Sequence, residues 1–139
     1  SPFSVSGELL RESAKLARRL KVRLHTHLAE TTDEENFTLS HFHMRPLEYM
    51  ESLGWTGDDV WYAHGIHFTD EELKYLTRNQ NRSCPSVRIS NMKLSSGIAK
   101  IPQMLELGVP VGLAVDGSAS NDGSNLLEEM RVDLPSPTA

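Results

Sequence analysis

The stretch Leu24-His25-Thr26-His27-Leu28-Ala29-Glu30 decides how this chain is interpreted, because it predicts a short apolar strand that ends in histidines and leads into an acidic loop. Side chains two residues apart on a strand share a face, so His25 and His27 can face one point in space. Glu30 follows the strand end, where its carboxylate can fold back over a ligand of His27. One metal ligand beside one proton carrier suits a hydrolytic metal site, although strand histidines are also often hydrogen-bonded core residues.

Length and composition limit the class of protein. The chain has 139 residues, enough for one domain but short of the roughly 250 that a closed eight-stranded barrel with its helices needs. No apolar run approaches the roughly 20 residues of a membrane span. The formal net charge of -5 provides no basic surface. We therefore expect no membrane or nucleic-acid partner and a small neutral or cationic ligand instead.

The number of cysteines and the first residues of the chain indicate where the protein resides and whether the chain is a fragment. The single Cys84 cannot form an internal disulfide, which predicts a reducing cytoplasm, and it excludes a cysteine-rich zinc site. The chain begins Ser1-Pro2-Phe3 without a recognisable signal peptide. The absence of an initiator methionine at this point suggests a fragment or a processed chain.

Strand and helix patterns alternate along the chain. Ser6 is a good N-cap for an amphipathic helix over residues 7–20, in which two apolar rows run side by side. The segment over residues 85–97 is rich in Ser and Asn and is predicted to be irregular. Further strands are predicted over residues 22–28, 59–64, 81–84 and 109–115, and further helices after Thr32, Pro46, Thr69, Ile101 and Asn125. This alternation predicts a parallel α/β arrangement with right-handed crossovers.

Three side chains with metal or acid-base chemistry stand at the ends of separate predicted strands. They are His27, His64 and Asp116, and each is followed by a polar loop. In α/β folds, ligands and catalytic groups collect at the carboxyl ends of the strands. Taken singly, His64 could be satisfied by backbone groups and Asp116 could be a turn carboxylate before Gly117. Together with Glu30 they form a set that suits Zn, Fe(II) or Mn.

Four segments carry motifs in a fixed order along the chain. The segments are His27-Leu28-Ala29-Glu30, Ala63-His64-Gly65-Ile66-His67, Cys84-Pro85-Ser86 to Asn91-Met92, and Val115-Asp116-Gly117-Ser118-Ala119-Ser120-Asn121. Together they resemble the amidohydrolase superfamily, and within it the cyclic-amidine deaminase and chlorohydrolase branch, most closely the 8-oxoguanine deaminases. The resemblance covers about residues 1–131 and implies a (β/α)8 TIM-type barrel, of which residues 1–139 form a fragment with strands five to eight.

The resemblance implies a role for each matching residue. His27 resembles the metal ligand of the fifth strand, and Glu30 the acid that carries a proton from water to the leaving nitrogen. His64 looks like the sixth-strand histidine that polarises the water or the ring carbon of the substrate. Asp116 looks like the eighth-strand metal ligand that also accepts a proton from the water.

Other polar residues have weaker assignments. Asn91, Ser118 and Ser120 are candidate substrate-binding residues, although Ser and Asn are also ordinary turn formers. His25 shares the face of His27 but lies deeper in the strand, so we expect it to be a supporting residue, as we do for His67.

The resemblance also implies an activity. The leading prediction is metal-dependent hydrolytic deamination of an aminated purine or pyrimidine of the 8-oxoguanine or isocytosine type, with one divalent metal, Zn before Fe. A triazine hydrolase or an adenosine-type deaminase would use the same core. A third alternative is an inactive half-barrel, because the first-strand His-x-His ligands of the family are absent from this chain. Half a barrel leaves open strand edges, which favours association, and a homo-oligomer of the full-length protein is one form this could take.

Two segments depart from the family pattern. Residues 82–90 are a few residues longer than the usual Cys-Pro-Ser-Ser-Asn-Met run, and Ser83 stands where a histidine is expected. Two prolines within residues 132–139 interrupt a helix that the family continues. Both features are typical of a fragment end or a reading-frame error.

Overall fold

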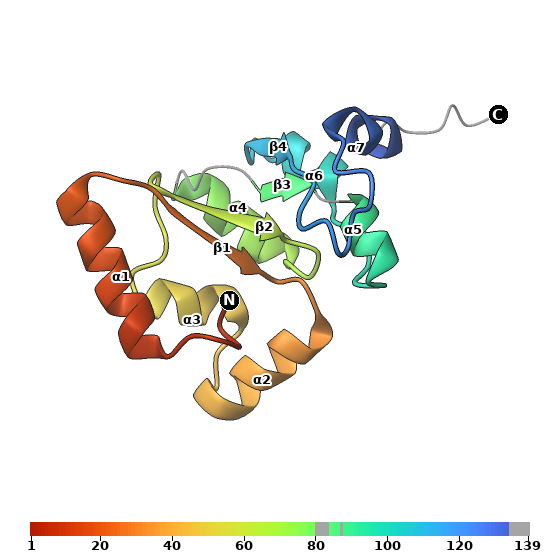
Figure 1. The fold of residues 1–139 in the computed structure, drawn as a ribbon. Helices are drawn as coiled ribbons and strands as arrows, with labels where there is room; N and C mark the ends of the chain where they lie inside the picture. The colour runs from red at the N-terminus through yellow and green to blue at the C-terminus, as the bar shows by residue number, and fades with distance from the viewer. Residues whose placement is uncertain (80–83, 87, 134–139) are drawn as a thin grey trace.

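The computed structural model describes residues 1–79, 84–86 and 88–133, which alternate between strands and helices (Figure 1). The strands are β1 (Leu24–Leu28), β2 (Val60–His64), β3 (Cys84–Ser86) and β4 (Val111–Leu113). The helices are α1 (Gly7–Leu20), α2 (Thr32–Phe42), α3 (Pro46–Ser52), α4 (Asp70–Arg78), α5 (Arg88–Lys93), α6 (Ile101–Glu106) and α7 (Leu126–Asp133).

The strands pair in parallel, as the sequence predicted. β1 pairs with β2, with Leu24 opposite Val60 and Leu28 opposite His64. β3 pairs with β4, with Cys84 opposite Val111. β2 also contacts β3, which brings the two pairs together. The carboxyl ends of the paired strands therefore lie at common edges.

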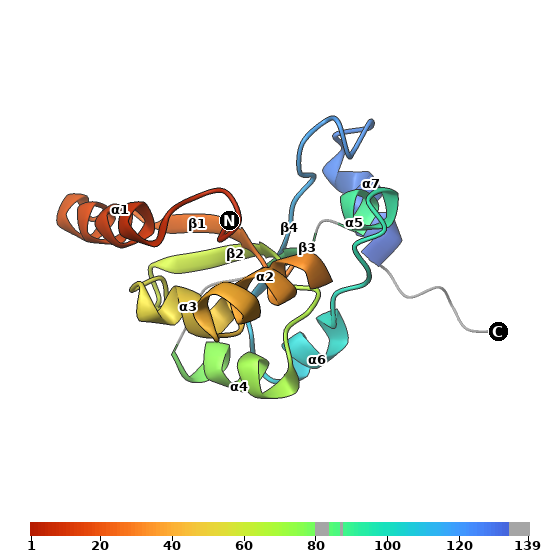
Figure 2. The same cartoon turned by 90° about the horizontal axis from the view of Figure 1, so that it is seen from below.

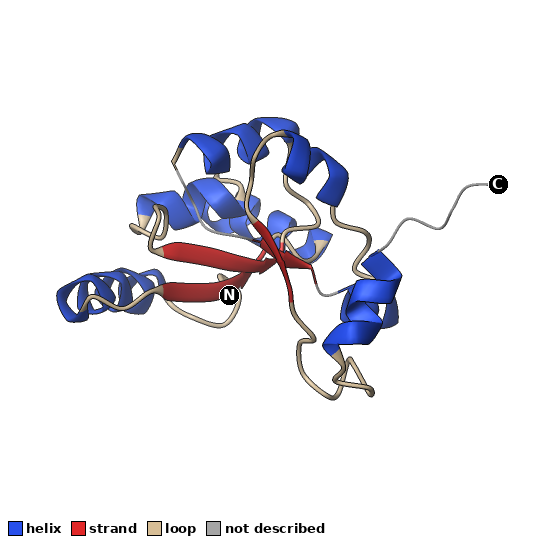
Figure 3. Ribbon diagram, turned by 90° about the horizontal axis from the view of Figure 1, so that it is seen from above, coloured by secondary structure: helices blue, strands red, loops and turns tan. Residues whose placement is uncertain are grey.

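Helices cover one face of the strands. Figure 2 shows α2, α3, α4 and α6 on the same side of β1 and β2, and Figure 3 shows the opposite side of these strands without a covering helix. The burial pattern of β1 agrees, since Leu24, Thr26 and Leu28 are buried whereas His25 and His27 are exposed. Alternate side chains of a strand face opposite ways, so this one strand provides both core residues and site residues.

The core lies between the two long strands and the helices that cover them. Tyr62 and Phe68 are its largest fully buried side chains. Other members are Leu10, Ala14, Ala17, Leu24, Leu28, Leu47, Met50, Leu53, Val60, Leu73, Leu76 and Met104. Within the described ranges, no helix combines the length and the hydropathy that crossing a bilayer requires.

Helix α1 has the predicted bounds and the predicted cap, since the Ser6 hydroxyl accepts a hydrogen bond from the Leu9 N–H at 3.3 Å. Only one of its two apolar rows is packed. Leu10, Ala14 and Ala17 are buried, whereas Leu9 is 57% exposed. Both rows fit a helical period equally well, and only contact with the rest of the fold distinguishes them.

Two local predictions were wrong. The segment over residues 85–97 is not wholly irregular, because β3 extends to Ser86 and α5 spans Arg88–Lys93. Long-range contacts outweigh the loop preference of Ser and Asn here, since Ser90 and Asn91 are both buried. The residues of β4 are only half-buried, although the apolar run of residues 109–115 is typical of a strand covered on both faces. The predicted strand over residues 81–83 and the proline-rich tail from residue 134 lie outside the described residues.

The Ser6 cap gives a test of how α1 is stabilised. Replacing Ser6 with alanine removes the acceptor for the Leu9 N–H, so Ser6→Ala should lower the free energy of unfolding by about 1 kcal/mol. Ser6→Asp keeps an acceptor and should be nearly neutral. Urea unfolding curves measure both, with Ser13→Ala in the middle of the same helix as the control. Equal unfolding midpoints for Ser6→Ala and the parent protein would contradict a stabilising cap.

Candidate active site

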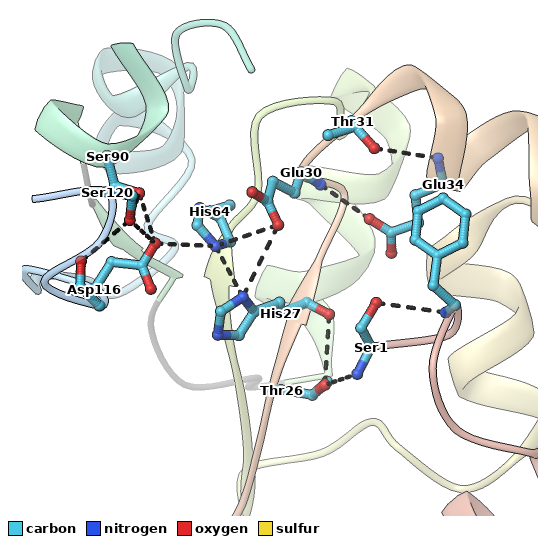
Figure 4. Close-up of polar contacts among 12 residues, drawn as sticks. Ser1, Thr26, His27, Glu30, Thr31, Glu34, His64, Ser90, Asp116 and Ser120 are labelled. Carbon is cyan, nitrogen blue, oxygen red and sulfur yellow. Dashed lines mark hydrogen bonds and ion pairs between the residues drawn. The ribbon is translucent and has the colours of Figure 1, made fainter. Parts of the chain in front are cut away.

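The candidate site is formed where three strands end (Figure 4). His27 lies on β1, His64 is the last residue of β2, and Asp116 follows β4. Glu30 lies two residues beyond β1. These four side chains come from segments far apart in the sequence, and the structure brings them together at one edge of the strands.

The ring of His64 lies at the centre of this group. Its Nε2 is 3.1 Å from His27 Nδ1, 3.5 Å from a Glu30 oxygen and 4.0 Å from an Asp116 oxygen. The same Glu30 oxygen is 3.9 Å from His27 Nδ1. Four potential ligand or proton-transfer atoms therefore surround one small volume.

The backbone turns sharply at the end of each of these strands. Ala29, His64 and Asp116 have φ values of 54°, 70° and 62°. Residues with a Cβ rarely adopt this left-handed region, and such residues cluster at functional sites. The turns direct the chain away from the strand while the side chains stay over its end.

His64 is held from behind by Asn91. His64 is only 1% exposed, and its Nδ1 lies 2.8 Å from the Asn91 side-chain oxygen. This contact assigns the proton to Nδ1 and leaves Nε2 facing the site as an acceptor. The Asn91 Nδ2 is buried and has no hydrogen-bond partner among the described residues. Sequence reasoning expected Asn91 on the substrate side and missed its contact with His64.

Asp116 is held by two serines. The Ser90 hydroxyl donates a hydrogen bond to Asp116 Oδ2 at 2.6 Å, and the Ser120 hydroxyl lies 3.4 Å from the same oxygen. Burial opposes ionisation of Asp116, but the hydrogen bonds from Ser90 and the Gly117 N–H and the nearby His64 lower its pKa below the ordinary value. The side chain is thus kept as a carboxylate, which is the form that binds a cation.

His27 and Glu30 form an ion pair. The Glu30 carboxylate raises the pKa of His27 against the effect of burial, and Asp116 raises it further. His27 in turn lowers the pKa of Glu30. The raised pKa means that protonated His27 stabilises the fold at low pH, and this contribution is lost as the pH rises from about 6.5 through the folded-state pKa. The lowered pKa of Glu30 contributes at higher pH and is lost as the pH falls below about 4.5.

The remaining predicted residues lie at the margin of the site. His25 stacks on Trp61, with 3.6 Å between ring centroids, and burial lowers its pKa. His67 Nε2 is 3.2 Å from the Ser96 carbonyl oxygen. Ser118 is exposed in the loop after β4, and no hydrogen bond joins it to the site within the described part of the chain. The structure thus brings Asn91 to the site, and Ser118 lies exposed two residues after Asp116.

The donor set fits a divalent ion. Imidazole nitrogens and carboxylate oxygens bind zinc at 2.0–2.2 Å, so neighbouring ligand atoms of a tetrahedral site lie about 3.3 Å apart. His27 Nδ1, a Glu30 oxygen and an Asp116 oxygen lie 3.1, 3.5 and 4.0 Å from His64 Nε2. His27, Glu30 and His64 form a candidate metal-binding group, and Asp116 adjoins it through His64.

Comparison with protein families identifies the chain. The model described as "Amidohydrolase family" matches residues 1–137. The chain belongs to the amidohydrolase family. The resemblance drawn from the strand-end motifs is therefore confirmed.

This amidohydrolase chain is similar to enzymes with several substrates. It is 52% identical to the 8-oxoguanine deaminase of Pseudomonas aeruginosa over 133 residues. The matched region covers 94% of this chain but only 29% of that protein. Its structure resembles that of atrazine chlorohydrolase from Arthrobacter aurescens TC1 complexed with zinc, with a TM-score of 0.86 and 32% sequence identity. The match covers 91% of this chain and 28% of the chlorohydrolase chain. It also resembles an adenosine deaminase from Xanthomonas campestris with bound zinc, with a TM-score of 0.89 and 27% identity over 94% and 29% of the two chains.

The ion pair of His27 and Glu30 makes a measurable prediction. In the metal-free protein, Glu30→Gln should lower the pKa of His27, because the neutral amide no longer stabilises the imidazolium. The pKa is read from the His27 ring proton by NMR across neutral pH. Asp116→Asn is the matched comparison and should lower this pKa less, since Asp116 acts at longer range. An unchanged His27 midpoint in Glu30→Gln would contradict the pairing.

Proposed function

We propose that this chain is the catalytic part of a larger metal-dependent amidohydrolase barrel, to which it contributes strands five to eight. The reaction is hydrolytic deamination of an aminated purine or pyrimidine of the 8-oxoguanine or isocytosine type. The observation that carries the proposal is the convergence of His27, Glu30, His64 and Asp116 around one point. The 52% identity to an 8-oxoguanine deaminase supports this choice of substrate class.

In this proposal His27 and Asp116 would hold one divalent ion, with zinc preferred to iron because zinc is bound in two similar structures. Such an ion would lower the pKa of a bound water towards about 7, which would supply a nucleophile at neutral pH. A catalytic zinc takes three protein ligands, so further ligands would come from outside these residues. We therefore expect residues 1–139 alone to bind metal weakly and to be inactive.

The side chains of this chain then divide the proton transfers. The Asp116 carboxylate accepts a proton from the attacking water. His64 presents Nε2 to the water or to the ring carbon, while Asn91 fixes its tautomer from behind. Glu30, within 4 Å of both histidines, takes the other proton of the water and carries it to the departing nitrogen, which leaves as ammonia. General acid-base transfer of this kind contributes about 10² to 10⁴ in rate.

Two related activities compete with this proposal. They are triazine hydrolysis and adenosine deamination, because the structure also resembles an atrazine chlorohydrolase and an adenosine deaminase. Substrate-side residues such as Ser118 would distinguish them, and in this chain Ser118 lies in an exposed loop. A cytoplasmic location and assembly of the full-length protein as a homo-oligomer belong to the same proposal.

Ammonia release by the full-length zinc-loaded protein tests the proposed reaction. We expect ammonia from 8-oxoguanine or isocytosine, and none after zinc is removed with a chelator. Adenosine and chlorinated triazines complete the panel. Activity confined to chloride or amine release from triazines would overturn the choice of a purine or pyrimidine substrate.

The proposed role of Glu30 has its own test. Glu30→Gln should lower kcat by about 10² to 10⁴, because the amide cannot carry the proton. Zinc content should stay unchanged. The control is Glu48→Gln, an exposed carboxylate on α3, which should leave kcat unaltered. A Glu30→Gln enzyme with the parent kcat would remove Glu30 from the reaction.

A further inference from the structure

Glu34, in the first turn of α2, is a buried carboxylate outside the proposed catalytic set. It is 2% exposed, and its Oε2 accepts a hydrogen bond from the Glu30 N–H at 3.1 Å (Figure 4). The Ala29 N–H also stabilises this carboxylate. The second oxygen of Glu34 has no hydrogen-bond partner among the described residues. Glu34 therefore holds the backbone of the residue proposed to carry the proton.

The contact is a variant of a common helix-capping arrangement. Thr31 is the N-cap of α2, and its hydroxyl accepts a hydrogen bond from the Glu34 N–H at 3.2 Å. In a standard capping box, the Glu at the third helical position bonds back to the N–H of the N-cap residue. Helix α4 follows that rule, since Glu72 accepts from the Thr69 N–H at 2.8 Å. In α2 the carboxylate reaches one residue further back and takes the Glu30 N–H instead.

The turn that Glu34 holds is costly to form. Ala29 has a φ of 54°, a left-handed conformation that is unfavourable for a residue with a Cβ. From the other side, the Ala29 carbonyl oxygen accepts a hydrogen bond from the His67 N–H at 2.9 Å. The turn is thus fixed on both of its sides, and its shape sets the direction in which the Glu30 side chain leaves the backbone.

The position of the Glu30 carboxylate depends on this turn. Its oxygen lies 3.5 Å from His64 Nε2 and 3.9 Å from His27 Nδ1. A displacement of about 1 Å in a catalytic group can cost on the order of 10²-fold in rate. Burial raises the pKa of Glu34, which means that a charged carboxylate is unfavourable at this position. A helix cap alone does not need a buried carboxylate, so we expect Glu34 to have the further role of positioning Glu30.

We propose that Glu34 is a positioning residue that fixes the Glu30 backbone and, through it, the proton-carrying carboxylate over the metal site. The inference rests on the proposed role of Glu30 in deamination. Glu34 does not touch the reacting atoms, and it acts only through the geometry of the turn at Ala29 and Glu30.

Two variants of the full-length zinc-loaded enzyme test this inference by ammonia release. Glu34→Met keeps the side-chain length but removes the acceptor, and it should lower kcat about 10- to 100-fold with little change in KM or zinc content. Glu34→Gln keeps a carbonyl oxygen for the Glu30 N–H and should retain most of kcat. Glu34→Ala is a second variant without an acceptor, to be used if the methionine does not pack.

The matched control is Glu72→Met, which removes the equivalent carboxylate from the capping box of α4. Glu72 also pairs with Arg45, so this variant should lose thermal stability without losing kcat. Equal losses of kcat in Glu34→Met and Glu72→Met would show that Glu34 has a general structural role only, and would overturn the inference.

A double-mutant comparison separates this inference from the proposed function. If Glu34 acts through Glu30, Glu34→Met should slow a Glu30→Gln enzyme no further. An undiminished effect in that background would overturn the positioning role. If Glu30→Gln is slow but Glu34→Met keeps the parent kcat, only the inference about Glu34 fails. If Glu30→Gln itself keeps the parent kcat, the proposed function fails and the inference fails with it.

Discussion

The parallel pairing of β1 with β2 is the constraint on which the candidate site depends. It places His64 opposite Leu28 and next to His27, and the left-handed backbone of His64, with a φ of 70°, ends the strand there with the ring 3.1 Å from His27. A shift of one residue in this register would turn the ring of one histidine to the other face of the sheet. The register is held by the core, because Leu24, Leu28 and Val60 must stay on the buried face while His27 stays exposed.

The candidate site is unfavourable by itself, and buried side chains next to it stabilise it. Two imidazoles and two carboxylates lie close together, and two of these four residues, His64 and Asp116, have left-handed backbones, as does the neighbouring Ala29. Two of the four members, His64 and Asp116, have a neutral partner that fixes them. Asn91 orients His64, and Ser90 holds Asp116. These partners lie on α5, so a short helix with few apolar residues organises half of the site.

The proteins similar to this chain are all hydrolytic enzymes, but they act on different substrates. Proteins similar to this chain include an 8-oxoguanine deaminase, an atrazine chlorohydrolase and an adenosine deaminase. They differ in the group that leaves and in the ring that carries it. All of these hydrolyses need an activated water, and deamination also needs a proton for the departing nitrogen. Residues in the loops beyond the strands are then expected to select the ring.

The sequence by itself determined the α/β class, the common face of His25 and His27, the caps at Ser6 and Thr69, and the family, because these follow from local spacing and from motifs in order. It could not determine which apolar row of α1 packs, that residues from Arg88 form a helix, or that Asn91 stands behind His64. Nor did it indicate the reach of Glu34 to the Glu30 backbone. These features depend on contacts between segments brought together only by strand pairing and core packing, and local periodicity carries no information about such contacts.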